Sequence, residues 1–170
     1  MNITNGLRKL CDTVNKIIYY IVAVLFAITL VSCTIQVFTR YVLNNSATWT
    51  DEVSRFSFIW ATMLGATICS WTYGHAVISF VVDRFPKKLN ALFRIISEII
   101  VIGISFILIV YSPRILQVSA IQKSPALQLP MFYIYISVPI CGCLFILYSI
   151  SHICDIIYND FFNKNKEVLS

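Results

Sequence analysis

Few side chains in this sequence could do chemistry, and they are set within long apolar runs. Glu98 is the only acid well inside such a run, where a carboxylate could couple to a proton or an ion. Glu98 also follows Arg94 by four residues, and this spacing on a helix favours a structural ion pair near a membrane boundary. The sequence leaves both interpretations open.

The two histidines and six cysteines give no firmer site. His75 and His152 each lie near the end of an apolar run, and a pair of helical histidines could in principle ligate a haem. The cysteines lack C-x-x-C spacing, which favours packing over a zinc site or a disulfide framework. The sequence also holds no phosphate-binding glycine loop and no nucleophile–base–acid set. We therefore predict no enzyme, and no catalytic, cofactor-binding or metal-binding residues.

A charged cluster precedes the second apolar run. Asp51 and Glu52 would lie in the first turn of a helix, where acids complement the positive end of the helix dipole. Arg55 follows them by four and three residues, so it can pair with either acid. The cluster marks a position where a protein partner could dock.

The apolar runs themselves define the fold class. A hydrocarbon core about 30 Å thick needs roughly 20 helical residues. The chain is 58% hydrophobic and 12% charged, whereas a soluble domain is about 25% charged. We predict an all-α integral membrane protein with four transmembrane helices in a single domain over residues 1–160, followed by a polar tail, 161–170. The spans fall at about 17–39, 56–80, 95–117 and 130–154.

The basic residues predict the orientation. One side of the membrane would carry Arg8, Lys9, Lys16, Arg84, Lys87, Lys88, Arg94, Lys164 and Lys166. The other side would carry only Arg40, Arg55, Arg114 and Lys123. The positive-inside rule then places both termini in the cytoplasm. The net charge of +5 is explained by this distribution rather than by nucleic-acid binding.

The residues before the first span form an amphipathic segment. Leu7, Leu10, Cys11 and Val14 would share one helical face, with the charged residues elsewhere. This pattern predicts a short N-terminal helix lying in the membrane interface before the chain turns inward. A frayed, charged leader is the alternative.

Aromatic and small residues suggest helix contacts. Trp49, Trp60 and Trp71 are spaced by eleven and would form a stripe on one helix. The outer two fit an aromatic belt at the membrane boundaries, whereas Trp60 lies deeper and could face a partner helix. Gly65 and Gly103 are small residues of the kind that let helices approach closely.

Prolines shape the entry to the last span. The segment 123–130 contains Ser124, Pro125 and Pro130 and cannot be a straight helix, so we expect a re-entry segment with the fourth span beginning near Pro130. Pro139 interrupts that span and is expected to bend it.

Taken together, these motifs resemble the small membrane subunit of tripartite ATP-independent periplasmic (TRAP) transporters. The resemblance covers residues 36–139, although the run from His75 to Asp83 is longer than the family pattern. It rests on Arg40-Tyr41-Val42-Leu43-Asn44, on Trp49-x-Asp51-Glu52-x-x-Arg55 with Phe58-Ile59-Trp60 and Gly65-Ala66, on Gly74-His75 and Asp83, and on Ser124-Pro125-Ala126-Leu127 with Leu129-Pro130-Met131, Tyr133, Tyr135 and Pro139.

The resemblance implies a division of labour in a bacterial inner membrane. A large membrane subunit would bind sodium and substrate and move as an elevator. A periplasmic binding protein would capture an organic acid, such as a C4-dicarboxylate or sialic acid. The small subunit would be a scaffold in lipid, without a cofactor and without nucleic acid. Its candidate interface or structural residues are Arg40, Trp49, Asp51, Glu52, Arg55, Trp60, Gly65, Glu98, Ser124, Pro125, Pro130 and Pro139.

Two alternatives remain from the sequence. An autonomous small multidrug-type carrier would require Glu98 to be essential for transport. A haem-bearing electron-transfer subunit would use His75 and His152 as ligands.

Overall fold

The described part of the chain is helical almost throughout. The computed structural model describes residues 2–44, 48–73 and 87–157, with side chains over 6–44, 48–72 and 93–157. Its helices are α1 (Asn2–Tyr41), α2 (Thr48–Tyr73), α4 (Lys87–Ile121), α5 (Phe132–Tyr135) and α6 (Ser137–Ile157). In these residues the sole β feature is an isolated bridge between Lys123 and Pro130. The predicted all-α fold is confirmed for this part.

Three helical stretches in the described residues are long and apolar enough to cross a membrane. They are Gly6–Tyr41, Phe93–Ile121 and Phe132–Ile157. The second predicted span, 56–80, begins within α2, but its last residues lie outside the described part. The described portion of α2 is also less apolar, because Ser57, Thr62, Thr67 and Ser70 interrupt it. The count of four spans therefore stays a prediction.

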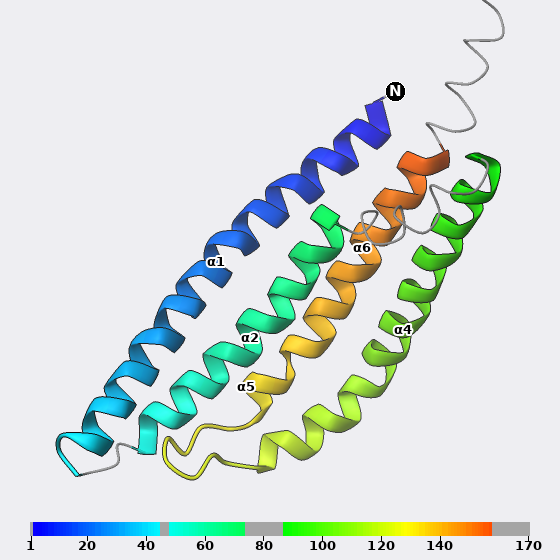
Figure 1. The fold of residues 1–170 in the computed structure, drawn as a ribbon. Helices are drawn as coiled ribbons and strands as arrows, with labels where there is room; N and C mark the ends of the chain where they lie inside the picture. The colour runs from blue at the N-terminus through cyan, green and yellow to red at the C-terminus, as the bar shows by residue number, and fades with distance from the viewer. Residues whose placement is uncertain (1, 45–47, 74–86, 158–170) are drawn as a thin grey trace, which may run out of the picture.

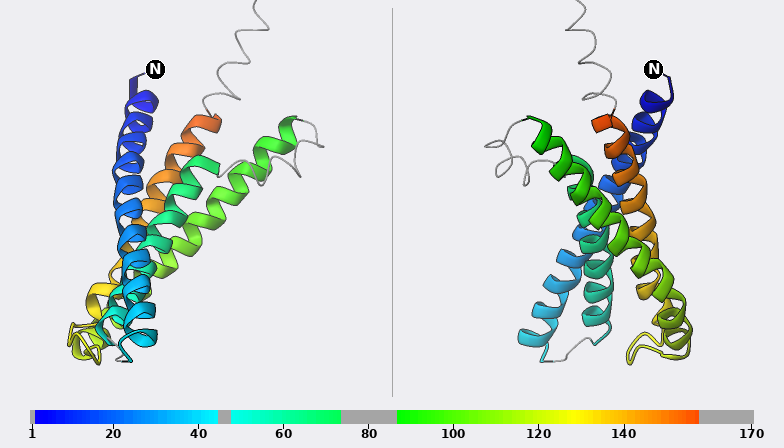
Figure 2. Two further views of the ribbon diagram at one scale, coloured as in Figure 1. Left: turned by 60° about the vertical axis from the view of Figure 1, so that its left-hand side comes forward. Right: turned by 90° about the vertical axis from the view of Figure 1, so that its right-hand side faces the viewer.

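The long helices lie side by side, in the order α1, α2, α6 and α4 (Figure 1). α4 packs on α6 and α5 and crosses the others at an angle, so that its N-terminal end lies well apart from that of α1 (Figure 2). We call the end where α1 finishes and α2 begins the Glu52 end. The opposite end, where α1 begins and α6 finishes, is the His152 end.

The apolar core joins α1, α2 and α6. Ile18, Leu64 and Cys141 are its buried members. Partly buried side chains pack around them, namely Val14, Val22, Leu25, Trp60, Ile68, Leu144 and Phe145. The remaining faces of the helices expose large apolar side chains, as expected where lipid or another apolar surface covers them.

A different kind of contact holds α4. Glu98, Ser105, Ser112 and Ser119 recur every seven residues along this helix, and all four are buried. Gly142 of α6 lies against the same helix, because a Cβ built there would come 3.0 Å from Ile109 Cγ1 and 3.4 Å from the Ser105 carbonyl. Small residues at such a contact let two helix backbones approach closely in a membrane.

The predicted short N-terminal helix is not a separate element. α1 runs without a break through Lys16 into the first apolar run, so the expected turn is absent. The physical reason is that residues 7–41 contain no glycine or proline. The apolar face of the N-terminal turns also has something to pack on, since Cys11 is buried and Val14 contacts the core.

The segment between α4 and α5 is a closed loop, as its prolines predict. Ser124 N donates to Leu129 O at 2.9 Å, and Met131 N donates to Gln122 O at 2.9 Å. Gln128 turns the chain with a φ of 54°. After α5, the helix is interrupted at Ile136, one turn before Pro139, which cannot donate a backbone hydrogen bond to the preceding turn. Pro139 thus lies in the first turn of α6.

Candidate functional site

The most complete polar site lies at the Glu52 end and centres on the Glu52 carboxylate. Its Oε1 accepts a hydrogen bond from Ala126 N at 2.8 Å, and its Oε2 accepts one from Leu127 N at 2.8 Å. The Ser124 hydroxyl donates a third bond to Oε2. Glu52 therefore fastens the start of α2 to the loop that connects α4 with α5.

The local sequence explains why the loop presents these donors. Ser124 and Gln128 close the loop through Gln128 N, which donates to Ser124 O at 3.2 Å. Pro125 has no N–H of its own and holds a fixed φ, so it leaves the next two amides to bond the carboxylate. The exposed side chain of Gln128 adds a bond to Pro125 O at 3.2 Å. The backbone after Pro125 thus forms a binding site for an anion, and the Glu52 carboxylate occupies it.

The environment keeps Glu52 charged. Burial alone raises the pKa of this carboxyl, but the three hydrogen bonds and the nearby Arg55 guanidinium outweigh it and lower the pKa below its ordinary value. A carboxylate that already accepts three hydrogen bonds is poorly placed to act as a base or to bind an ion. Its chemistry here is mechanical: it holds two segments together.

The sequence suggested that Arg55 pairs directly with Asp51 or Glu52, but the structure shows other contacts for the charged residues near Glu52. Asp51 accepts a hydrogen bond from the Gln36 side chain, which joins α1 to α2. Arg40 and Arg55 are both exposed, and within the described residues neither forms an ion pair with an acid. Arg55 therefore acts on Glu52 through its charge rather than through direct contact.

Two of the tryptophans differ in their surroundings, in line with the depths that the sequence indicated. Trp60 Nε1 donates to Tyr133 O at 3.0 Å, so this deeper residue links α2 to α5 within the chain. Trp49 is 49% exposed at the Glu52 end. Pro130 takes part in the bridge that closes the loop. Trp60 thus joins the same assembly of α2, the loop and α5 that Glu52 holds.

The two glycines expected to support close helix contacts, Gly65 and Gly103, do not do so in the structure. A Cβ built on Gly65 or on Gly103 would meet no heavy atom within 4 Å, so neither glycine supports a close helix contact inside the described chain. Gly142 does support one, and the sequence reasoning missed it. The signal was present, since Gly142 is a small residue in an apolar run just as Gly65 is.

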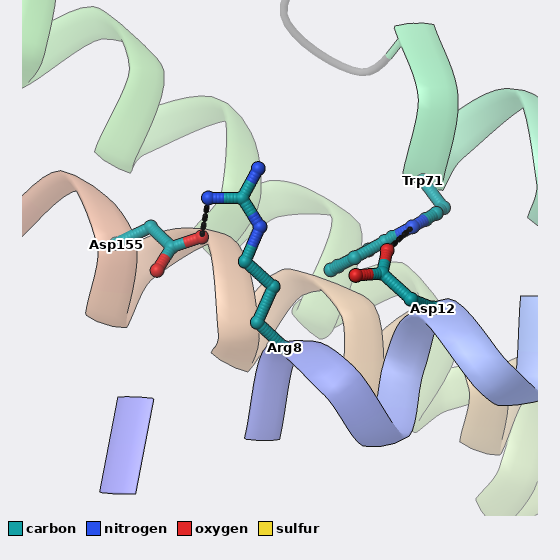
Figure 3. A network of polar contacts seen from close by, with 4 residues as sticks. All are labelled: Arg8, Asp12, Trp71 and Asp155. Atoms are coloured by element: carbon teal, nitrogen blue, oxygen red, sulfur yellow. Dashed lines mark hydrogen bonds and ion pairs between the residues drawn. The ribbon is translucent and has the colours of Figure 1, made fainter. Parts of the chain in front are cut away.

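A second polar cluster lies at the His152 end. Glu98 Oε1 and His152 Nδ1 are 3.0 Å apart, and both side chains are buried. Trp71 stacks on the His152 ring with centroids 5.0 Å apart and an interplanar angle of 9°. The Trp71 indole also donates to Asp12 Oδ1 at 3.0 Å (Figure 3). Residues from four helices are thus linked at this end.

This cluster replaces the predicted local ion pair. The described residues hold no ion pair between Arg94 and Glu98, and the Glu98 carboxylate instead contacts His152 of α6. Arg8 and Asp155 face each other at 4.0 Å between α1 and α6 (Figure 3). The other histidine of the haem hypothesis, His75, lies outside the described residues. No group of three or more metal-ligating side chains occurs in the described part of the chain.

Two relatives match most of the length of this chain. The chain is similar to a TRAP transporter small permease protein of Haemophilus influenzae, with 25% identity over 138 residues that cover 81% of this chain and 86% of the relative. It is similar to the sialic acid TRAP transporter small permease protein SiaQ of Vibrio cholerae, with 26% identity over 147 residues, 86% of this chain and 83% of the relative.

A third relative is much longer than this chain. The isethionate TRAP transporter permease protein DctMQ of Oleidesulfovibrio alaskensis is 28% identical over 97 residues, which are 56% of this chain and only 15% of the relative. The model of the family described as tripartite ATP-independent periplasmic transporters, DctQ component, matches residues 29–158. This chain is therefore a multi-pass inner-membrane protein that belongs to the DctQ component family of the tripartite ATP-independent periplasmic transporters.

Proposed function

We propose that this chain is the scaffold subunit of a sodium-coupled, binding-protein-dependent importer of an organic acid. In this role it packs against a large, elevator-type membrane subunit that binds sodium and substrate. The observation that carries the proposal is the Glu52 site, where a carboxylate within an acidic cluster is wholly engaged in holding α2 to the loop before α5. A side chain used in this way stiffens a frame and leaves transport chemistry to the partner.

The long relative supports a large membrane partner. Only 15% of the DctMQ permease protein matches this chain, so the equivalent segment there belongs to a much longer polypeptide. A stationary frame beside a moving domain is consistent with such an arrangement. The exposed apolar side chains of α1 and α4 offer surface for the partner, among them Val24, Leu30, Val31, Ile99, Ile100, Phe106 and Ile107.

The relatives also support the substrate class. Their names refer to sialic acid in one case and to isethionate in another, and both molecules are organic anions. We propose an organic acid for this system too, of the C4-dicarboxylate or sialic acid type. The residues that select it would belong to the large subunit and to the periplasmic binding protein.

The orientation is part of the same proposal. The excess of Lys and Arg near the His152 end favours a cytoplasmic position for that end and for both termini. The Glu52 end would then face the periplasm, on the side where the binding protein delivers its substrate. A cysteine introduced at Arg40 should accordingly react with a membrane-impermeant thiol reagent added outside spheroplasts.

The test is to purify and reconstitute the parts. The tagged chain should co-purify with the large membrane protein encoded beside it, and uptake in liposomes should need both proteins, the binding protein and a sodium gradient. Charge reversal at Glu52 and Arg55 should weaken assembly or uptake. Transport by this chain alone, or a haem Soret band that depends on His152, would overturn the scaffold assignment.

A further inference from the structure

A groove of two adjoining cavities runs between α1 and α2, starting near the His152 end. The first cavity has a volume of about 490 Å³ and is lined by the polar side chains Asp12, Asn15, Lys16 and Thr72 together with Tyr19, Tyr20 and Ile68; because it holds the charged side chains, we call it the polar cavity. The second, of about 290 Å³, is almost wholly apolar and is lined by Val22, Phe26 and Gly65 among others. Tyr19 and Ile68 line both cavities, so the groove is continuous from a part that holds charged side chains to an apolar part.

The groove changes character where the chain enters the membrane. Lys16 is the last charged residue of α1 before its long uncharged run, so the polar cavity lies at the level of the lipid headgroups. Tyr19 and Tyr20 add hydroxyl-bearing rings at the same level, as is usual at a membrane boundary. The apolar cavity then lies on the hydrocarbon side of that boundary. A ligand with a polar head and an apolar chain matches this sequence of environments.

The charged side chains of the polar cavity indicate which kind of ligand headgroup fits there. Asp12 and Lys16 line it one helical turn apart, yet they do not form an ion pair with each other. Trp71 donates to one Asp12 oxygen, Oδ1, as Figure 3 shows. Lys16 makes no ion pair with any described residue. An acid and a base that share a cavity without pairing are complementary to a zwitterion, whose cation would lie beside Asp12 and whose anion beside Lys16.

Gly65 gives the apolar cavity its space. A Cβ built at Gly65 would meet no heavy atom within 4 Å, so the position is open rather than packed against another helix of the described chain. Its neighbours in the cavity are aliphatic and aromatic side chains and Cys69. The apolar lining of this cavity is chemically suited to a flexible hydrocarbon chain.

We propose that this groove binds one phospholipid with a phosphoethanolamine headgroup. The ammonium group lies beside Asp12, the phosphate lies beside Lys16, and an acyl chain follows the groove past Gly65. A lipid with an anionic headgroup and no cation would pair with Lys16 but bring no positive charge to the Asp12 carboxylate, and it should therefore bind less tightly. An apolar helix of a partner protein would leave both charges unmatched.

Native mass spectrometry of the full-length chain in mild detergent tests the proposal, with phosphatidylethanolamine and phosphatidylglycerol added separately. Gly65→Leu fills the apolar cavity and should reduce retained phosphatidylethanolamine by roughly tenfold, the effect expected from the loss of a well-fitted apolar contact. Gly103→Leu is the matched control, because a Cβ there also meets nothing within 4 Å and Gly103 lies on α4, away from the groove. It should retain the lipid as the unaltered chain does.

A variant at Asp12 distinguishes recognition of the headgroup from binding of the acyl chain. Asp12→Asn keeps an oxygen for the Trp71 indole but removes the negative charge, so the preference for phosphatidylethanolamine over phosphatidylglycerol should disappear while lipid binding persists. Equal retention of both lipids by the unaltered chain would overturn the headgroup assignment. Equal retention by Gly65→Leu and Gly103→Leu would overturn the site. Loss of the lipid when the large subunit is bound would show that a partner helix occupies the groove instead, and would likewise overturn it.

Discussion

Glu52 and Ser124 are 72 residues apart in the sequence, and the Ser124 hydroxyl donates a hydrogen bond directly to the Glu52 carboxylate. Glu52 lies near the start of α2, just after its first turn, and Ser124 lies in the loop that precedes α5. Both are buried. Because Ala126 and Leu127 donate to the same carboxylate, the loop has one anchor rather than several weak contacts.

Replacing Glu52 by Ala should release this loop. Two backbone amides and one hydroxyl would lose a charged acceptor, and hydrogen bonds to charged groups are stronger than those between neutral groups. We expect hydrogen exchange of segment 124–131 to accelerate by roughly tenfold or more in detergent-purified protein. Asp51→Asn is the control, since it alters the neighbouring acid without touching the loop. Unchanged exchange in Glu52→Ala would contradict the anchoring role.

The same site should respond to acid. The folded pKa of Glu52 lies below its ordinary value of 4.5, so its stabilising contribution is fully present above that value. It is lost as the pH falls below 4.5 through the lowered pKa of the folded state. Exchange of segment 124–131 should therefore increase on acidification below this point, after correction for intrinsic rates. In Glu52→Gln the increase should be smaller, and an identical pH profile in both proteins would refute the assignment.

Replacing Trp60 by Phe should weaken the link between α2 and α5. The substitution keeps an aromatic ring in place but removes the indole N–H that donates to Tyr133 O at 3.0 Å. We expect a loss of about 1 kcal/mol in stability, measured by unfolding in detergent. Trp49→Phe is the matched control, because the Trp49 side chain is 49% exposed. A loss of equal size in both variants would show that the Tyr133 bond contributes nothing specific.

Replacing Gly142 by Leu should separate α4 from α6. A Cβ at Gly142 already comes 3.0 Å from Ile109 Cγ1, and the rest of a leucine would have to displace that side chain or the helix. Overpacking of this kind costs about 1–3 kcal/mol. Thermal unfolding should show the loss, whereas Gly103→Leu should show little change because Gly103 is open. Similar behaviour of the two variants would be evidence against a close α4–α6 contact.

Variants at Glu98 and His152 can distinguish a structural role of Glu98 from a role in proton or ion coupling. In the structure the Glu98 carboxylate lies 3.0 Å from His152 Nδ1, and the His152 ring stacks on Trp71. We expect His152→Ala to lower stability by about 2–3 kcal/mol, because it removes both the ring nitrogen that contacts a buried carboxylate and the ring that stacks on Trp71. Glu98→Gln, which can still hydrogen-bond, should retain uptake in proportion to the amount of assembled complex. Normal assembly with abolished uptake would instead favour a role for Glu98 in proton or ion coupling.

The features that depend on local sequence could be predicted. Apolar runs gave the helical membrane class, and the prolines around Ser124 gave the loop before α5, because a proline limits its own backbone wherever the chain folds. The charged cluster at Asp51 and Glu52 was also recognised as a site. These predictions rest on chain length, composition and backbone restriction, which do not require knowledge of distant contacts.

The features that depend on helix packing could not be predicted. Arg94 is the nearest base to Glu98 in the sequence, yet the carboxylate lies beside His152, 54 residues away. Gly65, Gly103 and Gly142 look alike in the sequence, but of these three only Gly142 lies in close contact with a neighbouring helix of the described chain. Two of the three partners of Glu52 are backbone N–H groups, which every residue except proline possesses, so composition gives no indication of them.

The continuity of α1 has a mechanical consequence. A helix of 40 residues is about 60 Å long, roughly twice the thickness of the hydrocarbon core. Its first turns therefore extend beyond the hydrocarbon core as a continuous part of the helix, which is joined to α2 through Asp12 and Trp71 and to α6 through Arg8 and Asp155. Because no break separates these turns from the rest of α1, a force applied to them would be transmitted directly to the membrane-embedded helices.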